Sequence, residues 1–260
     1  MFETIRTTTD ARGVARLILN RPEKHNAMNS EMIAEITQVA QMLGEDWSVR
    51  AVVLEAEGKS FCAGGDLAWM KAQMAADSST RGREARKLAE MLRALNQLPK
   101  PLIGRVQGPA YGGGVGIMSV CDVVIASRSA TFALTETRLG LIPATIGPYV
   151  IARMGETMAR RVFMSARLFD AEEAVSLGLV ARAVDNDALD AAIEAEITPY
   201  FACAPRAVAR AKSLAQYLGS RIEPQDIDHS IAQLVACWED PEAEEGISAF
   251  FARRRPRWAQ

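Results

Sequence analysis

The chain has 260 residues, of which 49% are hydrophobic and 24% are charged, and its formal net charge is −2. A chain of this length and composition is typical of a globular protein that buries a hydrophobic core in one large or two small domains. The slightly negative net charge disfavours a general nucleic-acid-binding protein, but it does not point to a substrate class.

The N-terminal stretch MFETIRTTTDARG has no apolar targeting segment, and no uncharged apolar run approaches the ~18 residues of a membrane span. The two histidines, His25 and His229, belong to no motif with metal-ligand spacing, which disfavours a transition-metal site. The cysteines form no CxxC pair and are expected to be free thiols in a reducing compartment. We therefore expect a cytoplasmic protein without a membrane span or a metal. The cysteines are Cys62, Cys121, Cys203 and Cys237.

Strands and helices alternate over about the first 185 residues. Alternating patterns over 4–8 and 14–20 flank a turn signal and predict a hairpin, and unalternated apolar runs predict buried strands. Helical spacing predicts a helix capped by Asn29 or Ser30 and stopped by Gly44. The Met- and Ala-rich segment up to Thr80 is expected to be mobile. Further strands are predicted at 51–57, 102–106, 122–126 and 179–184, and further helices at 81–98, 155–164 and 170–177, the last opening on a capping-box-like Asp170 and Glu173.

The last ~70 residues are predicted to be helical, with no strand between the helices. These helices are expected at 189–200, 205–218, 227–238 and 242–254.

Two glycine-rich junctions lie between a predicted strand and a predicted helix: Ala63-Gly64-Gly65-Asp66 and Tyr111-Gly112-Gly113-Gly114. Glycine lets the backbone approach a ligand closely, and N–H groups at such junctions point outward. As an isolated pattern, such a junction is more often a tight packing turn. Two of them, followed by Glu136 in uncharged surroundings, favour proton transfer next to a carbonyl whose oxyanion the N–H groups stabilise.

Three other motifs of nucleotide-binding proteins and hydrolases are incomplete or absent. Gly58-Lys59-Ser60 resembles the end of a P-loop, but Val53 stands where that motif needs glycine. The glycines from Gly112 to Gly116 follow GxGxG rather than the GxGxxG of a dinucleotide site. No GxSxG elbow is present, which disfavours a serine hydrolase.

The chain resembles the enoyl-CoA hydratase/isomerase (crotonase) superfamily over essentially its whole length. The motifs are RPEKHNAMN, SFCAGGDLAWM, PLIGRVQGPAYGGGVGI, CDVVIAS, ATFALTETRLGLIP and FFARRRPRW, in this order. The resemblance implies an α/β fold: a spiral catalytic core of ββα units over 1–190, and a C-terminal helical region over 191–260 that forms a homotrimer or a dimer of trimers. The implied substrate is an acyl-CoA thioester, with coenzyme A as part of the substrate and no separate cofactor.

The resemblance also implies roles for individual residues. Gly65 and Gly113 match the oxyanion donors, and Glu136 matches the catalytic acid/base. The coenzyme A contacts map to Lys24, His25, Ala27, Ala63, Gly64, Asp66, Leu67, Phe250 and Arg253, and the acyl pocket maps to Met70, Tyr111, Gly116, Thr135 and Leu139. Trp69 is expected to be a lid or a pocket wall.

One position departs from the family pattern. Hydratases of the best-known type carry a second glutamate where this chain has Gly116. Three explanations of this departure compete. The first is a hydratase in which Glu136 acts alone or with the substrate's own remote carboxylate. The others are a 3,2-enoyl-CoA isomerase that shuttles one proton and a relative that has lost activity. We favour the hydratase, because several motifs are similar to those of bacterial hydratases of branched glutaconyl-CoA thioesters from leucine and acyclic-terpene degradation. On this interpretation Gly116 leaves room for a branched or carboxylated acyl group.

The predicted helix over 81–98 has a basic face, which matches an RNA-binding surface in one eukaryotic relative. Glu84 and Glu90 interrupt this face and no aromatic platform is interleaved with it. A solvated helix face or a contact with coenzyme A phosphates is the preferred interpretation.

Overall fold

Six strands form the larger of two sheets in the computed structural model, which describes residues 2–259. Their order is β1-β2-β3-β4-β6-β9. The β1–β2 pair is antiparallel, as the predicted hairpin requires, and the other neighbouring pairs are parallel. The strands are β1 (Ile5–Thr9), β2 (Val14–Leu19), β3 (Ala51–Ala56), β4 (Leu102–Val106), β6 (Val123–Ser127) and β9 (Arg182–Val184).

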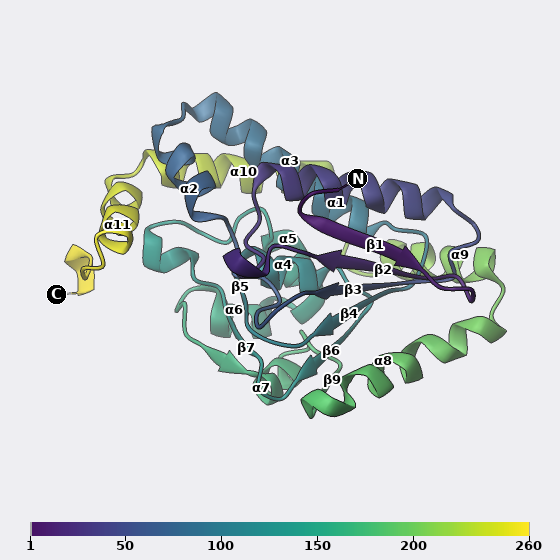
Figure 1. The fold of residues 1–260 in the computed structure, drawn as a ribbon. Helices are drawn as coiled ribbons and strands as arrows, with labels where there is room; N and C mark the ends of the chain where they lie inside the picture. Colours follow the sequence, from purple (N-terminus) through teal and green to yellow (C-terminus); the bar gives the residue numbers. More distant parts are fainter. Residues whose placement is uncertain (1, 260) are drawn as a thin grey trace.

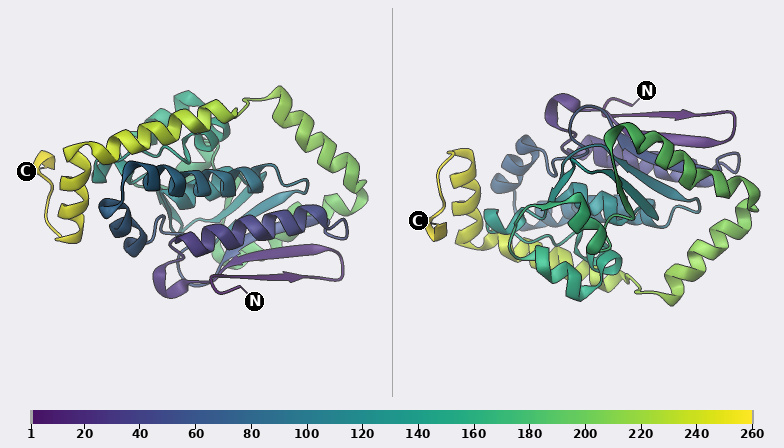
Figure 2. Two further views of the ribbon diagram at one scale, coloured as in Figure 1. Left: turned by 90° about the horizontal axis from the view of Figure 1, so that it is seen from above. Right: turned by 90° about the horizontal axis from the view of Figure 1, so that it is seen from below.

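Helices cover both faces of this sheet. Helices α1 (Ser30–Glu45), α3 (Ser78–Asn96) and α10 (Pro224–Glu239) run side by side over one face, and α8 (Leu189–Ile197) covers the other (Figures 1 and 2). Alternate strand residues serve the two faces: Val52 and Leu54 join the core beneath α1 and α3, whereas Val53 packs toward α8. The unalternated apolar runs predicted strands that are buried on both faces, and the structure confirms this prediction.

Parallel strands bring the two glycine junctions together. The segments that follow β3 and β4 both leave the same edge of the sheet. Cys62 forms an isolated parallel bridge with Ala110, and the Tyr111 N–H donates to the Cys62 carbonyl at 2.9 Å. Two segments almost 50 residues apart in sequence therefore lie in contact.

A second sheet consists of very short strands, and the turn that carries Glu136 follows one of them in the sequence. Its order is β5-β7-β8, and a hydrogen bond of 2.9 Å from the Gly112 N–H to the Ala133 carbonyl ties β7 to the second glycine junction. Strands of two or three residues show no recognisable alternation, so they were not predicted from the sequence. They are β5 (Ala110–Tyr111), β7 (Thr131–Ala133) and β8 (Phe169–Asp170).

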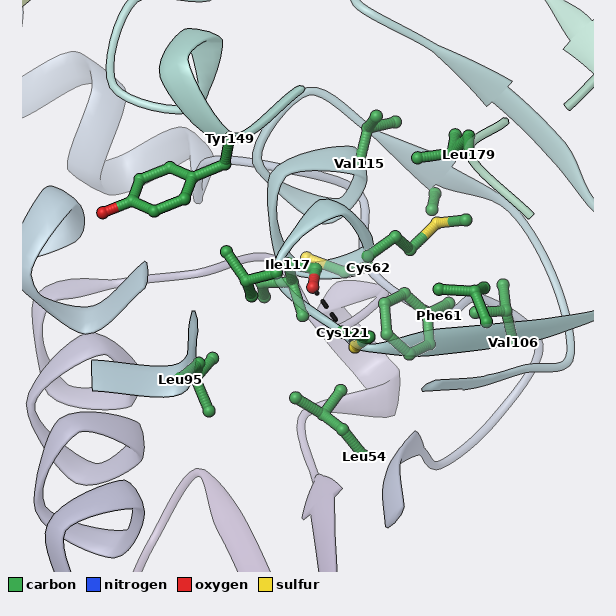
Figure 3. Packing of buried hydrophobic residues seen from close by; sticks show 14 of the residues in the cluster. Leu54, Phe61, Cys62, Leu95, Val106, Val115, Ile117, Cys121, Tyr149 and Leu179 are labelled. Carbon is green, nitrogen blue, oxygen red and sulfur yellow. Dashed lines mark hydrogen bonds between the residues drawn. The ribbon is translucent and has the colours of Figure 1, made fainter. Parts of the chain in front are cut away.

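Helix α4 (Gly113–Ser119) passes through the core, and all of its residues are buried. Figure 3 shows Val115 and Ile117 of this helix among the buried side chains that surround Phe61, Cys62 and Cys121. The Cys121 thiol donates to the Ile117 carbonyl. Close packing of these side chains restricts the movement of α4.

The remaining helices follow the predicted pattern with specific corrections. Gly44 does not stop α1, which continues to Glu45. The segment expected to be mobile contains α2, which the Asp66 side chain caps. Helix α5 was not predicted from the sequence. The predicted strand over 179–184 is shortened to β9. These helices are α2 (Leu67–Ala75), α5 (Gly147–Met154), α6 (Glu156–Phe163), α7 (Ala171–Ser176), α9 (Pro205–Leu218) and α11 (Pro241–Phe251).

Several local predictions are confirmed. Asn29 caps α1 by accepting from the Met32 N–H, and Asp170 caps α7 by accepting from the Glu173 N–H. The reciprocal half of that capping box is absent, because the Glu173 side chain pairs with Arg167 instead. All four cysteines are free. No helix within residues 2–259 is long and apolar enough to cross a bilayer.

Candidate functional site

A cavity of about 420 Å³ lies where the two glycine junctions, the 3₁₀ turn η2 (Glu136–Leu139) and the C-terminal helices meet. Its wall is mostly apolar, which favours the binding of an acyl chain and strengthens any electrostatic interaction inside it. The lining residues are Met28, Ile33, Ala63, Gly64, Gly65, Leu67, Trp69, Met70, Leu88, Tyr111, Gly112, Gly113, Thr135, Glu136, Arg138, Leu139, Leu141, Ile142, Pro143, Ala144, Thr145, Ile146, Leu234, Trp238 and Phe250.

The first candidate donor is the N–H of Gly65. Gly65 forms a parallel bridge with Met28, whose N–H donates to the Gly64 carbonyl and whose carbonyl accepts from the Asp66 N–H, both at 2.8 Å. In such a bridge the flanking residues face the partner, so the N–H of Gly65 points to the opposite side. It has no acceptor within residues 2–259.

The second candidate donor is the N–H of Gly113, the first residue of α4. An N–H in the first turn of a helix has no intrahelical acceptor, and this one has none elsewhere in residues 2–259. The junctions lie close together: a Cβ placed on Gly64 would be 3.7 Å from the Gly113 nitrogen. Two unpaired donors from different segments therefore border one cavity, as an oxyanion site requires.

Glu136 supplies the carboxylate. It begins η2, and its side chain packs against Gly112, where an added Cβ would lie 2.9 Å from Oε1 of Glu136. Gly112 also has a φ of +48°, so both its conformation and its contact favour glycine. The Oε2 atom is buried and has no hydrogen-bond partner among the described residues. Burial raises the pKa of Glu136 to about 7, which lets it exchange a proton near neutral pH.

Gly116 does not line the cavity, so the expectation that it leaves room for the acyl group is wrong. A Cβ on Gly116 would lie 2.8 Å from the Cβ of Ile146, whose side chain occupies this space. Ile146 is buried and lines the cavity. The position at which the family pattern has its second glutamate is thus covered by an isoleucine from another segment.

Gly112 and Gly116 are four residues apart and joined by a helical hydrogen bond of 3.2 Å, so they lie on one face of α4. Gly112 contacts Glu136 and Gly116 contacts Ile146. The carboxylate therefore has an apolar neighbour one helical turn away.

The other predicted site residues divide into two groups. Those that line the cavity are Met70, Tyr111, Thr135 and Leu139 of the predicted acyl pocket, and Ala63, Gly64, Leu67 and Phe250 of the predicted coenzyme A contacts. Trp69 is part of the wall as well, and its indole N–H donates to Glu84 at 3.4 Å.

The second group lies outside the cavity lining. Lys24 and His25 belong to the 3₁₀ turn region before α1, where Nδ1 of His25 is 3.0 Å from the Ser60 hydroxyl, and Ala27 is buried. Arg253 is exposed with a φ of +52°.

Asp66, also outside the lining, has a local structural role. Its side chain caps α2 and pairs with Arg21 at 3.0 Å. Burial acts to raise the pKa of Asp66, but the hydrogen bonds from Arg21 and the α2 amides outweigh it and hold the pKa below its usual value. Asp66 therefore remains a carboxylate that orders the first glycine junction.

The wall that α10 contributes was not predicted from the sequence. Leu234 and Trp238 line the cavity, although α10 lies about 100 residues beyond Glu136 in the sequence. The Arg81 guanidinium stacks over Trp238 at 5.4 Å and donates to the Gln73 and Met74 carbonyls. No local pattern distinguishes these residues from the core positions of an ordinary amphipathic helix.

The basic face of α3 is occupied by partners within the chain. Of its basic side chains, Arg81 holds α2 and α10 as described, and the others bind acidic or hydroxyl groups. The pairs are Arg83 with Ser79 and Thr80, Arg86 with Asp228, Lys87 with Glu84, and Arg93 with Glu90. Such pairing disfavours the RNA-binding interpretation.

Comparison with known proteins agrees with the geometry. The enoyl-CoA hydratase/isomerase family model matches residues 9–260. A protein named enoyl-CoA hydratase AKT6-1 from Alternaria alternata is 32% identical over 252 residues, which are 95% of this chain and 82% of that protein.

Solved structures are similar over nearly the whole chain. An enoyl-CoA hydratase from Mycobacterium avium has a TM-score of 0.89 and 30% identity, covering 99% of this chain and 100% of that one. Pseudomonas aeruginosa AtuE has a TM-score of 0.81 and 38% identity, with the same coverage of 99% and 100%. These matches confirm the α/β crotonase-type fold with its C-terminal helices. The chain is therefore an enzyme of the enoyl-CoA hydratase/isomerase family.

Proposed function

We propose that this enzyme is an enoyl-CoA hydratase that adds water to, or removes it from, a 2-enoyl-CoA thioester. The observation that carries the proposal is the carboxylate of Glu136, whose Oε2 atom is buried without a hydrogen-bond partner in an apolar cavity that two unpaired N–H groups also border. Addition of water to a conjugated thioester builds negative charge on the thioester oxygen. Preorganised donors stabilise that charge, each contributing about 3 kcal/mol at comparable oxyanion sites.

The proposed reaction uses one carboxylate for both proton transfers. The thioester oxygen accepts hydrogen bonds from the N–H groups of Gly65 and Gly113. The Glu136 carboxylate takes a proton from water as the water oxygen bonds to Cβ, and the electrons of the double bond move to form the enolate. The resulting carboxylic acid then donates that proton to Cα, which restores the thioester and the ionised glutamate.

We place the coenzyme A portion along the first glycine junction, where Ala63, Gly64 and Leu67 line the cavity. The turn that contains Lys24, His25 and Ala27 contacts this junction, because the Ala63 N–H donates to the His25 carbonyl at 3.0 Å. Phe250 of α11 lines the cavity too, and Arg253 follows it closely. No other cofactor takes part in the proposed reaction.

We propose a branched or carboxylated acyl group, similar to 3-methylglutaconyl-CoA. Within residues 2–259, Arg138 is the one cationic side chain of the cavity lining, and it has no acidic partner. A guanidinium at this place is suited to bind a remote carboxylate. Ile146 fills the space next to Gly116, so open space there does not support this substrate class. The proposed pairing of Arg138 with a carboxylate of the substrate supports it instead.

A 3,2-enoyl-CoA isomerase is the second candidate. It needs one acid/base that moves a proton between Cα and Cγ, and it needs no water. Ile146 lines the same cavity as Glu136, and no second carboxylate among residues 2–259 lines it to hold water, which favours this reaction.

We further propose that the enzyme assembles into a homotrimer or a dimer of trimers. Helix α9 exposes Leu214, Tyr217 and Leu218, with exposed fractions of 57%, 62% and 74%. Large apolar side chains this exposed on one helix are typical of an interface. Native mass spectrometry of the full chain tests the proposal, and a monomer at micromolar concentration contradicts it.

A substrate panel tests the reaction. Wild type, Glu136→Gln and Arg138→Met are each incubated with 2-enoyl-, 3-enoyl-, glutaconyl- and 3-methylglutaconyl-CoA, and conjugated-thioester absorbance and product mass are followed. Loss of absorbance with a gain of one water identifies the hydratase, whereas a gain of absorbance from the 3-enoyl substrate without a mass change identifies the isomerase. Glu136→Gln should lower kcat by about 100-fold or more. Arg138→Met should raise KM for the carboxylated substrates only. Unchanged turnover in Glu136→Gln contradicts the mechanism.

A further inference from the structure

Helix α11 rests directly on the turn that carries Glu136. Gly246 of α11 faces η2 so closely that an added Cβ would lie 2.5 Å from the carbonyl carbon of Leu139. Gly140, which ends η2 with a φ of +70°, faces the start of α11, and a Cβ there would lie 2.6 Å from the Ala243 nitrogen. The two backbones thus meet at two points where only glycine leaves room.

A separate small hydrophobic cluster holds this contact together. Its buried members are Leu141, Ala243 and Ile247, and Leu139, Leu234 and Trp238 pack against it. The cluster is distinct from the main core beneath the sheet. Figure 1 shows α11 at the end of the molecule, beyond α10 and close to α2, with no strand beneath it. Its hold on the rest of the chain therefore depends mainly on η2 and α10.

The two helices joined by this cluster also form part of the cavity wall. Phe250 from α11 and Leu234 and Trp238 from α10 line it on the side of η2. If α11 moved away, the cavity would lose the part of its wall that Phe250 provides. The wall of the cavity that holds Glu136 thus includes a helix more than 100 residues further along the chain.

We propose that α11 is a positioning element for Glu136: the glycine contacts at Gly140 and Gly246 fix the η2 turn and keep bulk solvent, but not the single reacting water, away from its carboxylate. The inference rests on the proposed role of Glu136 in proton transfer. It predicts that loosening α11 weakens catalysis through Glu136, not only through substrate binding.

Few other ionisable groups face Glu136. Helix α4 beneath the carboxylate carries none, and the cavity lining adds only Tyr111 and Arg138 among the described residues. Helix α11 carries Glu242, Glu244 and Glu245. Glu245 is engaged by Arg254 and Arg257, and its hydrogen bonds with Arg254 lower its pKa to about 2. Glu245 therefore does not change charge near neutral pH, and desolvation is the main influence on Glu136.

The test substitutes Gly246→Ala. Alanine is the better helix former, so a loss of function would come from the contact with Leu139 rather than from helix propensity. We expect the acid limb of the pH profile of kcat/KM to move down by about one pH unit or more and kcat to fall about tenfold, because bulk solvent reaches the carboxylate. The Leu141 amide, which donates to the Glu136 carbonyl at 3.1 Å, should exchange its hydrogen faster.

Two further variants make the test specific. Ile247→Ala removes a fully buried anchor of α11 without adding a clash, and it should produce the same changes even if Gly246→Ala fails to fold. Gly82→Ala in α3 is the matched control, because its Cβ would meet its nearest neighbour, Val235, at 3.9 Å. It should leave the acid limb and the exchange rate unchanged.

The outcomes separate the inference from the proposed function. An active wild type whose acid limb and Leu141 exchange stay the same in both Gly246→Ala and Ile247→Ala contradicts the positioning role alone. A change in KM with an unmoved acid limb also contradicts it, since α11 would then only bind substrate. A wild type that turns over no acyl-CoA instead contradicts the proposed function.

Discussion

The neighbours of Gly112, which immediately precedes α4, and of Gly116 within α4 determine which chemistry the cavity supports. Gly112 allows the carboxylate of Glu136 to lie against the helix backbone, and Gly116 allows Ile146 to do the same one turn later. A side chain at either position would displace the neighbour it meets. One face of a buried helix thus places a proton-transfer group and an apolar wall side by side.

This arrangement predicts a coupled pair of substitutions. Gly116→Ala should destabilise the protein by about 1–3 kcal/mol despite the higher helix propensity of alanine, because its Cβ collides with Ile146. Ile146→Ala should cost about 2–5 kcal/mol by itself, through the cavity that it leaves. The double variant should be more stable than the sum of the two effects by about 1 kcal/mol or more. Urea unfolding of all four proteins measures the coupling, and strict additivity would show that the two side chains do not compete for space.

Local patterns were enough to predict some site residues but not others. Gly65, Gly113 and Glu136 stand in short motifs whose residue types carry the chemistry, and the structure brings them to one cavity. Ile146 follows the motif around Glu136 with no periodicity or turn signal that would point back to Gly116. The expectation of open space at Gly116 failed for this reason: a missing side chain at one position says nothing about which distant side chain fills the gap.

Element length decided how well the secondary structure could be predicted. The long amphipathic helices α1, α3 and α10 and the buried strands β3 and β4 show clear periodicity, and their predicted bounds differ from the observed ones by a few residues. Strand β7 has three residues, and α2 is a single short helix without an apolar stripe. Tertiary contacts, rather than local sequence, determine these elements.

The pairing of charges on α3 predicts that this helix does not bind RNA specifically. Its arginines and its lysine already bind partners from α2, α10 or their own helix, so a phosphate would have to displace them. We expect no mobility shift of single-stranded RNA at physiological salt in excess coenzyme A. A salt-dependent shift that survives the excess and is lost in Arg86→Ala would contradict this expectation.

At the scale of the whole molecule, the buried carboxylate of Glu136 should reduce stability at high pH. Its pKa in the folded protein is about 7, above the ordinary glutamate value of 4.5, so ionisation disfavours the folded state. The stability is therefore fully present below about pH 4.5 and is lost as the pH rises through about 7. From about pH 5 to pH 8 the loss should reach about 2 kcal/mol.

Comparison with Glu136→Gln isolates this effect. The variant cannot ionise at this position, so its advantage in free energy of unfolding over wild type should grow by the same amount between the two pH values. Denaturant titrations of both proteins at each pH measure the difference. An advantage that is equal at both pH values would mean that the Glu136 carboxylate is hydrated in solution.

The most direct test of the account is the pH dependence of kcat/KM for wild type with its best 2-enoyl-CoA substrate. Glu136 must be ionised to take a proton from water, and burial raises its pKa to about 7, so the rate should fall below about pH 7 with the loss of one ionised group. A rate that stays constant down to about pH 5 would contradict the account, because the active carboxylate would then have the pKa of an ordinary hydrated glutamate.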